Sequence, residues 1–210
     1  ATWQASKTKT FTNNQTVNIK VRDQAGNVSN GQAIVINKID KTIPNANFAF
    51  VSGTAGSNSW YKSDVVLKIT PTAGGSGVTS YKYCTTTSSC TPTTSISGSG
   101  TTNVTLTSNS SANKVCVITT NGAGVSSGTI CSSLYKIDKG SPTAPTITMK
   151  LKDASGTTYN GTCTRENVYV ELNSSSTSGI SKYEWLENGT WTTRALTTSN
   201  NKGIITYSSE

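Results

Sequence analysis

The chain has 210 residues, a formal net charge of +8 and only 33% hydrophobic residues. It contains no His, which removes the usual general base, the usual nitrogen ligand of metals and every Ser-His or Cys-His nucleophile. Its ten acidic residues show no spacing typical of paired carboxylates, so we expect a protein that is not an enzyme and has no cofactor. The Lys and Arg residues are scattered, so the charge predicts no nucleic-acid partner. No apolar run approaches the length of a membrane span.

In chain order, the predicted elements are all β-strands. Apolar residues alternate with polar ones in three segments far apart in the chain, which are Val17, Ile19 and Val21, then Val65, Leu67 and Ile69, then Val168, Val170 and Leu172. Within residues 43–140 we expect seven strands, at about 46–51, 64–70, 79–84, 91–96, 103–107, 114–120 and 129–136. Seven short strands in about 98 residues are typical of an immunoglobulin-like sandwich. No segment has a sustained helical period, so we expect almost no helix.

One segment of the sequence occurs twice. Residues 23–44 contain D-Q-A-G-N-V-S and then K-I-D-K-T-I-P, and residues 121–142 contain N-G-A-G-V-S-S and then K-I-D-K-G-S-P. The copies are 98 positions apart, which indicates tandem copies of a small domain. We therefore predict the C-terminal part of one repeat at 1–42, a complete repeat at 43–140 and the N-terminal part of a further repeat at 141–210.

A second motif supports this division. Ser76-Gly77-Val78-Thr79-Ser80-Tyr81 recurs as Ser178-Gly179-Ile180-Ser181-Lys182-Tyr183, which places the third strand of the last repeat. We also expect Trp60 to open the second strand of the complete repeat.

These motifs resemble the last hairpin and linker of bacterial immunoglobulin-like (Big-type) tandem repeats of large extracellular proteins. The resemblance implies an all-β fold of tandem immunoglobulin-like β-sandwiches in an elongated array, located outside the cell on a bacterial surface. It implies a structural or spacer segment of a filament, stalk or adhesin. The alternatives are an adhesion module that binds a glycan or a host protein, and a surface decoration of a phage or virion. Trp3 and Trp191 are candidate ligand-binding aromatics, but we expect them in a core or interface.

The repeated motif has a structural interpretation. Asp23 can accept backbone N–H groups of a tight turn, Gly26 can adopt the positive φ of that turn, and the prolines that close each linker end the last strand. Calcium is the alternative, because related arrays sometimes bind it at domain joints. The candidate ligands are Asp23, Asn27, Asp40 and Asp138. Too few carboxylates are present for six to eight oxygen ligands, so the hydrogen-bonded turn is favoured.

The cysteines predict two disulfides. Cys116 and Cys131 are symmetric about Ala123-Gly124, so a hairpin centred there places them opposite each other, and both should face outward because Val115 and Val117 face inward. Cys84 and Cys90 can close the loop after the third strand, although Cys84 with Cys116 is an alternative pairing. Two disulfides indicate an oxidising, extracellular setting. Cys163 is left over and pairs with a missing part of its repeat, with another molecule or with nothing.

The partial repeats suggest two kinds of partner. Residues 16–40 form a spare last hairpin, and residues 141–210 lack their last two strands, so each molecule can complete the next one head to tail. The favoured interpretation is that the chain belongs to a longer array, in which flanking repeats are its neighbours.

Overall fold

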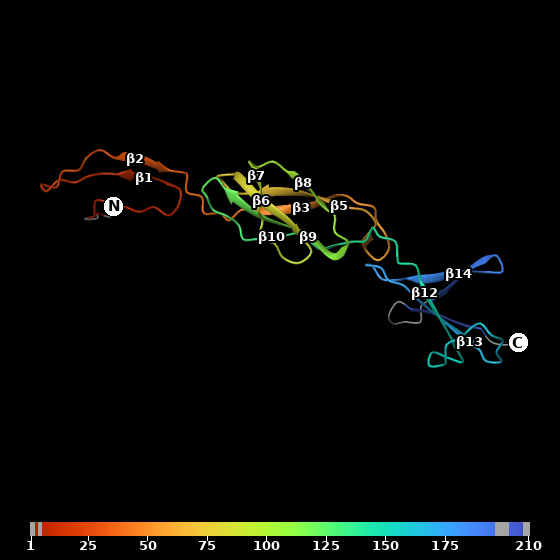
Figure 1. Cartoon of the computed structure of the whole chain (residues 1–210). Coiled ribbons are helices and arrows are strands. Elements are labelled where there is room, and N and C mark those ends of the chain that lie inside the picture. Colours follow the sequence, from red (N-terminus) through yellow and green to blue (C-terminus); the bar gives the residue numbers. More distant parts are fainter. Residues whose placement is uncertain (1–2, 4–5, 196–201, 208–210) are drawn as a thin grey trace.

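The computed structural model describes residue 3, residues 6–195 and residues 202–207. In this part of the chain every regular element is a β-strand, and three bodies follow one another along an elongated molecule (Figure 1). The expected all-β class is confirmed. None of the described residues forms a helix that is long and apolar enough to cross a membrane.

The N-terminal body is a two-stranded hairpin formed by β1 (Gln15–Ile19) and β2 (Gln32–Ile36), in which Val17 lies opposite Ile34. The strand β1 lies where the alternation of Val17 and Ile19 predicted a strand, but the predicted burial of its apolar face is wrong. Ile19 is 44% exposed and Val21 is 68% exposed, because among the described residues no second sheet covers this face.

The central body contains two sheets that share one core. The strands are β3 (Asn45–Ser52), β4 (Trp60–Tyr61), β5 (Val65–Thr72), β6 (Val78–Thr86), β7 (Thr94–Ser97), β8 (Thr102–Leu106), β9 (Ser110–Asn121), β10 (Ile130–Cys131) and β11 (Tyr135–Ile137). One sheet has the order β3-β5-β8, and the other has the order β4-β11-β9-β6-β7, with β10 also paired to β9. The alternating residues Val65, Leu67 and Ile69 of β5 are fully buried against Val115 and Val117 of β9.

Two expectations for the central body need correction. Trp60 does not open the strand that contains Val65; it lies in β4, a separate two-residue strand that runs parallel to β11. The single strand expected at 129–136 is divided into β10 and β11, because the chain between them leaves the register and exposes Leu134. Neither feature has an alternating pattern that would reveal it in the sequence.

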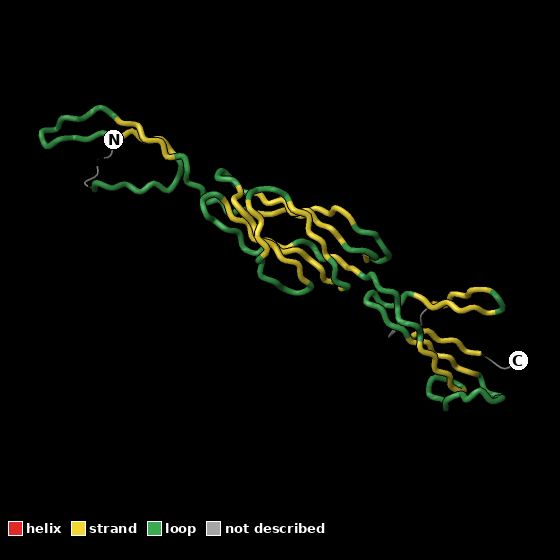
Figure 2. Tube along the Cα trace, turned by 45° about the horizontal axis from the view of Figure 1, so that its top comes forward, coloured by secondary structure: helices red, strands yellow, loops and turns green. Residues whose placement is uncertain are grey.

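The C-terminal body repeats part of this arrangement. Its strands are β12 (Thr146–Leu151), β13 (Val168–Asn173), β14 (Lys182–Glu187), β15 (Thr190–Ala195) and β16 (Lys202–Tyr207). The order β12-β13-β16 corresponds to β3-β5-β8, and the hairpin β14-β15 corresponds to β6-β7. Figure 2 shows these two groups of strands beside each other. Val170, Leu172, Tyr183 and Ile205 form a small core between them.

Candidate functional site: the joints between the bodies

The first joint is organised by the carboxylate of Asp40 in the linker between β2 and β3. One oxygen accepts the backbone N–H of Thr42 at 2.9 Å, which folds the linker on itself. The other accepts the backbone N–H of Ser76 at 2.8 Å and the Ser76 hydroxyl. Ser76 belongs to the turn between β5 and β6, so Asp40 connects the linker directly to the central body.

Asn121 adds a second connection at the same joint. Its side-chain amide donates to the carbonyl oxygen of Thr42 at 3.0 Å and to Asp40 Oδ2 at 3.4 Å. Its Oδ1 atom accepts the backbone N–H of Val125 at 2.8 Å, as Asp23 Oδ1 accepts the N–H of Asn27 at 2.7 Å in the N-terminal hairpin. Asn at this position therefore makes the same turn as Asp and supplies a donor, which a carboxylate lacks.

The second joint is built in the same way. Asp138 accepts the backbone N–H of Ser178 at 2.9 Å, the hydroxyl of Ser176 at 2.8 Å and the backbone N–H of Gly140 at 3.2 Å. Ser178 occupies the position in the C-terminal body that Ser76 occupies in the central body. In both joints, the Asp of the K-I-D-K motif thus binds the Ser-Gly turn of the body that follows.

Asparagine side chains fix the linkers from the other side. Asn14 Oδ1 accepts the backbone N–H of Ile39 at 2.8 Å, and its amide donates to the Ile39 carbonyl at 3.1 Å. In the second joint, Asn109 Oδ1 accepts the backbone N–H of Lys139 at 3.1 Å. The preceding body therefore holds a residue next to each Asp, Ile39 at the first joint and Lys139 at the second, and the following body binds the carboxylate of the Asp.

These hydrogen bonds stabilise the charged form of both carboxylates. The side-chain hydrogen bond from Ser76, followed by the backbone N–H of Thr42, lowers the pKa of Asp40 far below its usual value. At Asp138, partial burial by itself would raise the pKa, but the hydrogen bonds from Ser178 and Ser176 outweigh it and the pKa is lowered. Both joints therefore contain ionised Asp near neutral pH.

We expect both joints to loosen in acid. A carboxylate whose pKa is lower in the folded state contributes stability above its unfolded pKa, near 3.8, and this stability is lost as the pH falls through the lower folded value. Small-angle X-ray scattering from pH 7 downward should show constant extension to about pH 4 and a broader, shorter distribution below it. Loss of extension already above about pH 4, with intact strand content by circular dichroism, would contradict this prediction.

Close packing of two turns supports the first joint. The backbone N–H of Gly122 donates to the Gly77 carbonyl at 2.9 Å, and a Cβ atom on Gly122 would lie 2.5 Å from the Ser76 carbonyl oxygen. Only glycine allows this approach, and the Ser76 turn is the one that Asp40 binds.

Gly122→Ala is expected to lower the free energy of unfolding by about 1–3 kcal/mol, because the new methyl group has to displace the Ser76 backbone. Differential scanning calorimetry measures the loss. Gly128→Ala is the matched control, since a Cβ atom there meets nothing within 4 Å. An equal effect of both substitutions would rule out the contact with Ser76 as the cause.

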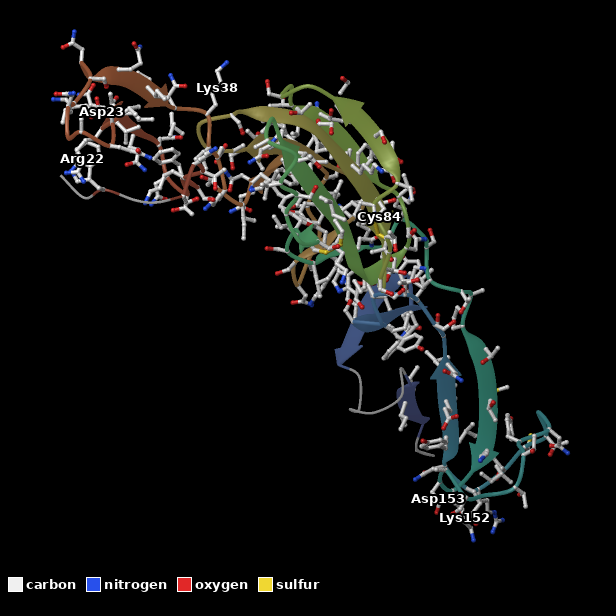
Figure 3. The ribbon with its side chains drawn as sticks, turned by 90° about the vertical axis from the view of Figure 1, so that its left-hand side faces the viewer. Arg22, Asp23, Lys38, Cys84, Lys152 and Asp153 are labelled. Atoms are coloured by element: carbon white, nitrogen blue, oxygen red, sulfur yellow. A yellow bond between two sulfur atoms is a disulfide. The ribbon has the colours of Figure 1, made fainter. Side chains whose placement is uncertain are left out.

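The four candidate calcium ligands lie at three separate places. Asp23 and Asn27 bind each other in the turn between β1 and β2, with Asn27 Nδ2 2.8 Å from Asp23 Oδ2. Figure 3 shows Asp23 beside Arg22, away from Lys38 at the linker. Asp40 and Asp138 belong to different joints. Within the described residues, no three His, Cys, Asp or Glu side chains form a group suited to a metal ion.

The structure contains the disulfides Cys84–Cys90 and Cys116–Cys131, while Cys163 is exposed and unpaired. Cys116 lies opposite Cys131 on one neighbouring strand and opposite Cys84 on the other. Cys116 and Cys131 face away from the core, as expected, because Val115 and Val117 take the inward positions. Cys131 is exposed, but Cys116 is only 1% exposed, because Cys131 and Cys84 lie beside it on the two neighbouring strands.

Neither of the two candidate tryptophans lies in a core. Trp191 on β15 is 68% exposed, and Trp3 is 47% exposed with the guanidinium carbon of Arg22 4.7 Å from its ring centre. A separate hollow of about 350 Å³ in the central body is lined by other aromatic residues, which are Trp60, Tyr61 and Tyr135. Sequence reasoning did not identify this hollow, because β4 and β11 are far apart in the chain.

Sequence reasoning placed Asp40 and Asp138 at joints but did not find Ser76, Ser178 or Asn121 as their partners. The recurrence of Ser-Gly after each K-I-D-K motif was the available signal. No protein-family model matches the chain, and no curated protein or solved structure is significantly similar to it.

Proposed function

We propose that this chain is a non-enzymatic structural segment of an extracellular bacterial surface filament, stalk or adhesin. Its units would act as spacers that hold a distal part of a larger assembly away from the cell envelope. The observation that carries the proposal is the repeated joint, in which Asp40 and Asp138 each bind the Ser-Gly turn of the next body. A joint built twice in the same way sets successive bodies in a defined direction, which suits a spacer.

The proposal assigns immunoglobulin-like units to this array. In the central body, the first, second and fifth long strands (β3, β5 and β8) form one sheet, and β11, β9, β6 and β7 form the other. This division of strands resembles that of immunoglobulin-like sandwiches. The two disulfides favour an oxidising environment outside the cytoplasm.

A double variant of the joints tests the spacer function. Asp40→Ala with Asp138→Ala removes the acceptor from both Ser-Gly turns, so the bodies should reorient and the maximum dimension in small-angle X-ray scattering should decrease. In addition, the residual dipolar couplings measured for the three bodies should no longer fit a single alignment tensor.

Asp153→Ala is the matched control. Asp153 accepts the N–H and hydroxyl of Ser155 at 2.8 and 2.6 Å within a loop at the outer end of the C-terminal body (Figure 3), and its pKa is also lowered, first by the Ser155 hydroxyl. The Asp153→Ala substitution removes the same chemical group as the joint variants but does not affect a joint. A double joint variant that stays as extended as this control would refute the spacer proposal.

The second candidate is an adhesion module that binds a glycan. It is favoured by the hollow at Trp60, Tyr61 and Tyr135, since aromatic rings beside polar backbone are a common surface for ligands. A glycan array probed with the whole chain and with Trp60→Ala separates the two functions. Binding of a glycan that Trp60→Ala abolishes would favour the adhesion module. If the chain binds no glycan on the array, the result favours the spacer function.

A further inference from the structure

The outer face of the larger sheet in the central body carries a row of cysteines across β10, β9 and β6. Cys116 of β9 lies opposite Cys131 of β10 on one side and opposite Cys84 of β6 on the other. Side chains that lie directly opposite each other in antiparallel strands share one face of the sheet. This face points away from the core, because the core contains Val115 and Val117 on either side of Cys116.

The two disulfides leave one pair of neighbours in this row unbonded to each other. Cys116 is bonded to Cys131, and Cys84 is bonded to Cys90 in the loop that follows β6. Directly opposite residues of an antiparallel ladder have Cα atoms about 4.5–5.5 Å apart, and a disulfide spans about 4.4–6.8 Å between Cα atoms. A bond between Cys84 and Cys116 therefore fits the register of β6 and β9 without a shift of either strand.

The exposure of the cysteines sets the direction in which an external thiol can attack. Cys131 is exposed, whereas Cys116 is 1% exposed, so the sulfur that solvent reaches in this bond is that of Cys131. Attack there releases the sulfur of Cys116, next to Cys84. Lys82 and Lys114 lie on the same face, each two residues along the strand from one of these cysteines, and positive charge favours a thiolate.

We propose that the four cysteines form a disulfide relay, in which reduction by an external dithiol yields a new Cys84–Cys116 bond and free thiols at Cys90 and Cys131. Loss of one disulfide then leaves β6 and β9, which lie side by side in the middle of the sheet, joined covalently. The proposal concerns the chemistry of the central body, and it holds equally for a spacer and for an adhesion module.

The relay consists of three exchange steps. A thiolate of the dithiol attacks the Cys131 sulfur, and the electron pair of the broken S–S bond leaves on Cys116. The Cys116 thiolate attacks the Cys84 sulfur, and the electron pair of that bond leaves on Cys90, which takes a proton from water. The second thiol of the dithiol then displaces Cys131. The dithiol loses two electrons and two protons to become a cyclic disulfide, and the protein gains them as two S–H groups.

Attack on the other disulfide leads to the same product. A thiolate that attacks Cys90 releases Cys84, which attacks Cys116 and displaces Cys131. The identity of the reduced form is therefore independent of which bond is reduced first.

The test reduces the whole chain with one equivalent of dithiothreitol after the exposed Cys163 has been blocked with N-ethylmaleimide. Acid stops the exchange, because it removes the thiolates, and the new thiols are labelled in denaturant with isotope-labelled N-ethylmaleimide. Peptide mapping by mass spectrometry should find the label at Cys90 and Cys131, and a peptide pair joined through Cys84 and Cys116. Label at any other pair, or no singly reduced form, would overturn the proposal.

Cys84→Ala with Cys90→Ala is the matched control. This variant has no second disulfide to receive the exchange, so the same treatment should label Cys116 and Cys131. The control shows that the label reaches Cys116, and the absence of label there in the wild type then reports the exchange.

A second variant tests the new bond without any reduction. Cys90→Ala with Cys131→Ala keeps only the two inner cysteines of the group, which should form the Cys84–Cys116 disulfide in a glutathione redox buffer with the wild-type strand content by circular dichroism. Cys84→Ala with Cys116→Ala is the comparison, and its Cys90 and Cys131 should stay reduced. Free thiols in the first variant, or a bond formed equally well in the second, would overturn the proposal.

Discussion

Replacing Leu67 with Ala is expected to lower the free energy of unfolding of the central body by about 2–5 kcal/mol. Leu67 has no exposed surface and lies in the middle of β5, where both sheets contribute to the core. The substitution removes three carbon atoms from this core and leaves a cavity that the two hydrogen-bonded sheets close only in part. Urea unfolding followed by tyrosine and tryptophan fluorescence measures the loss.

Leu134→Ala is the matched control for this prediction. Leu134 is 60% exposed between β10 and β11, so the same change in side chain should alter stability by less than about 0.5 kcal/mol. Similar losses at Leu67 and Leu134 would contradict the shared core, because a body without close packing between its sheets would not distinguish the two positions.

Removing the Cys116–Cys131 disulfide by replacing both residues with Ala is expected to cost about 3 kcal/mol, since the bond closes a segment of 15 residues. For a unit of about 100 residues, this corresponds to a decrease in Tm of roughly 15 °C. Thermal unfolding monitored by circular dichroism measures it. Both cysteines have to be replaced together, because Cys116 also lies opposite Cys84 and a single free thiol there can exchange with the Cys84–Cys90 bond.

The comparison variant replaces Cys84 and Cys90 with Ala. This bond has a sequence separation of six, so its loss should cost about 2 kcal/mol and should be the smaller of the two effects. A larger loss from this pair than from Cys116 and Cys131 would show that chain closure does not set the contribution of these disulfides.

Several features of this protein are determined by local sequence. The alternation of Val65, Leu67 and Ile69 predicts a strand with one buried face, and β5 has that form. The symmetry of Cys116 and Cys131 about a Gly-containing turn places them opposite each other, which is where β9 and β10 hold them. Strand alternation and tight turns involve residues that are near each other in the chain, so the sequence alone is sufficient for them.

Burial and the joints were decided only by the tertiary structure. Ile19 and Val117 belong to equivalent strands, yet one is exposed and the other buried, because burial requires a second sheet that comes from a distant part of the chain. The Asp40–Ser76 contact joins residues 36 positions apart and depends on where the turn between β5 and β6 is held. A local sequence pattern indicates the periodicity of a strand but not which residues pack on the strand's apolar face. That packing depends on which other elements of the fold lie against the strand.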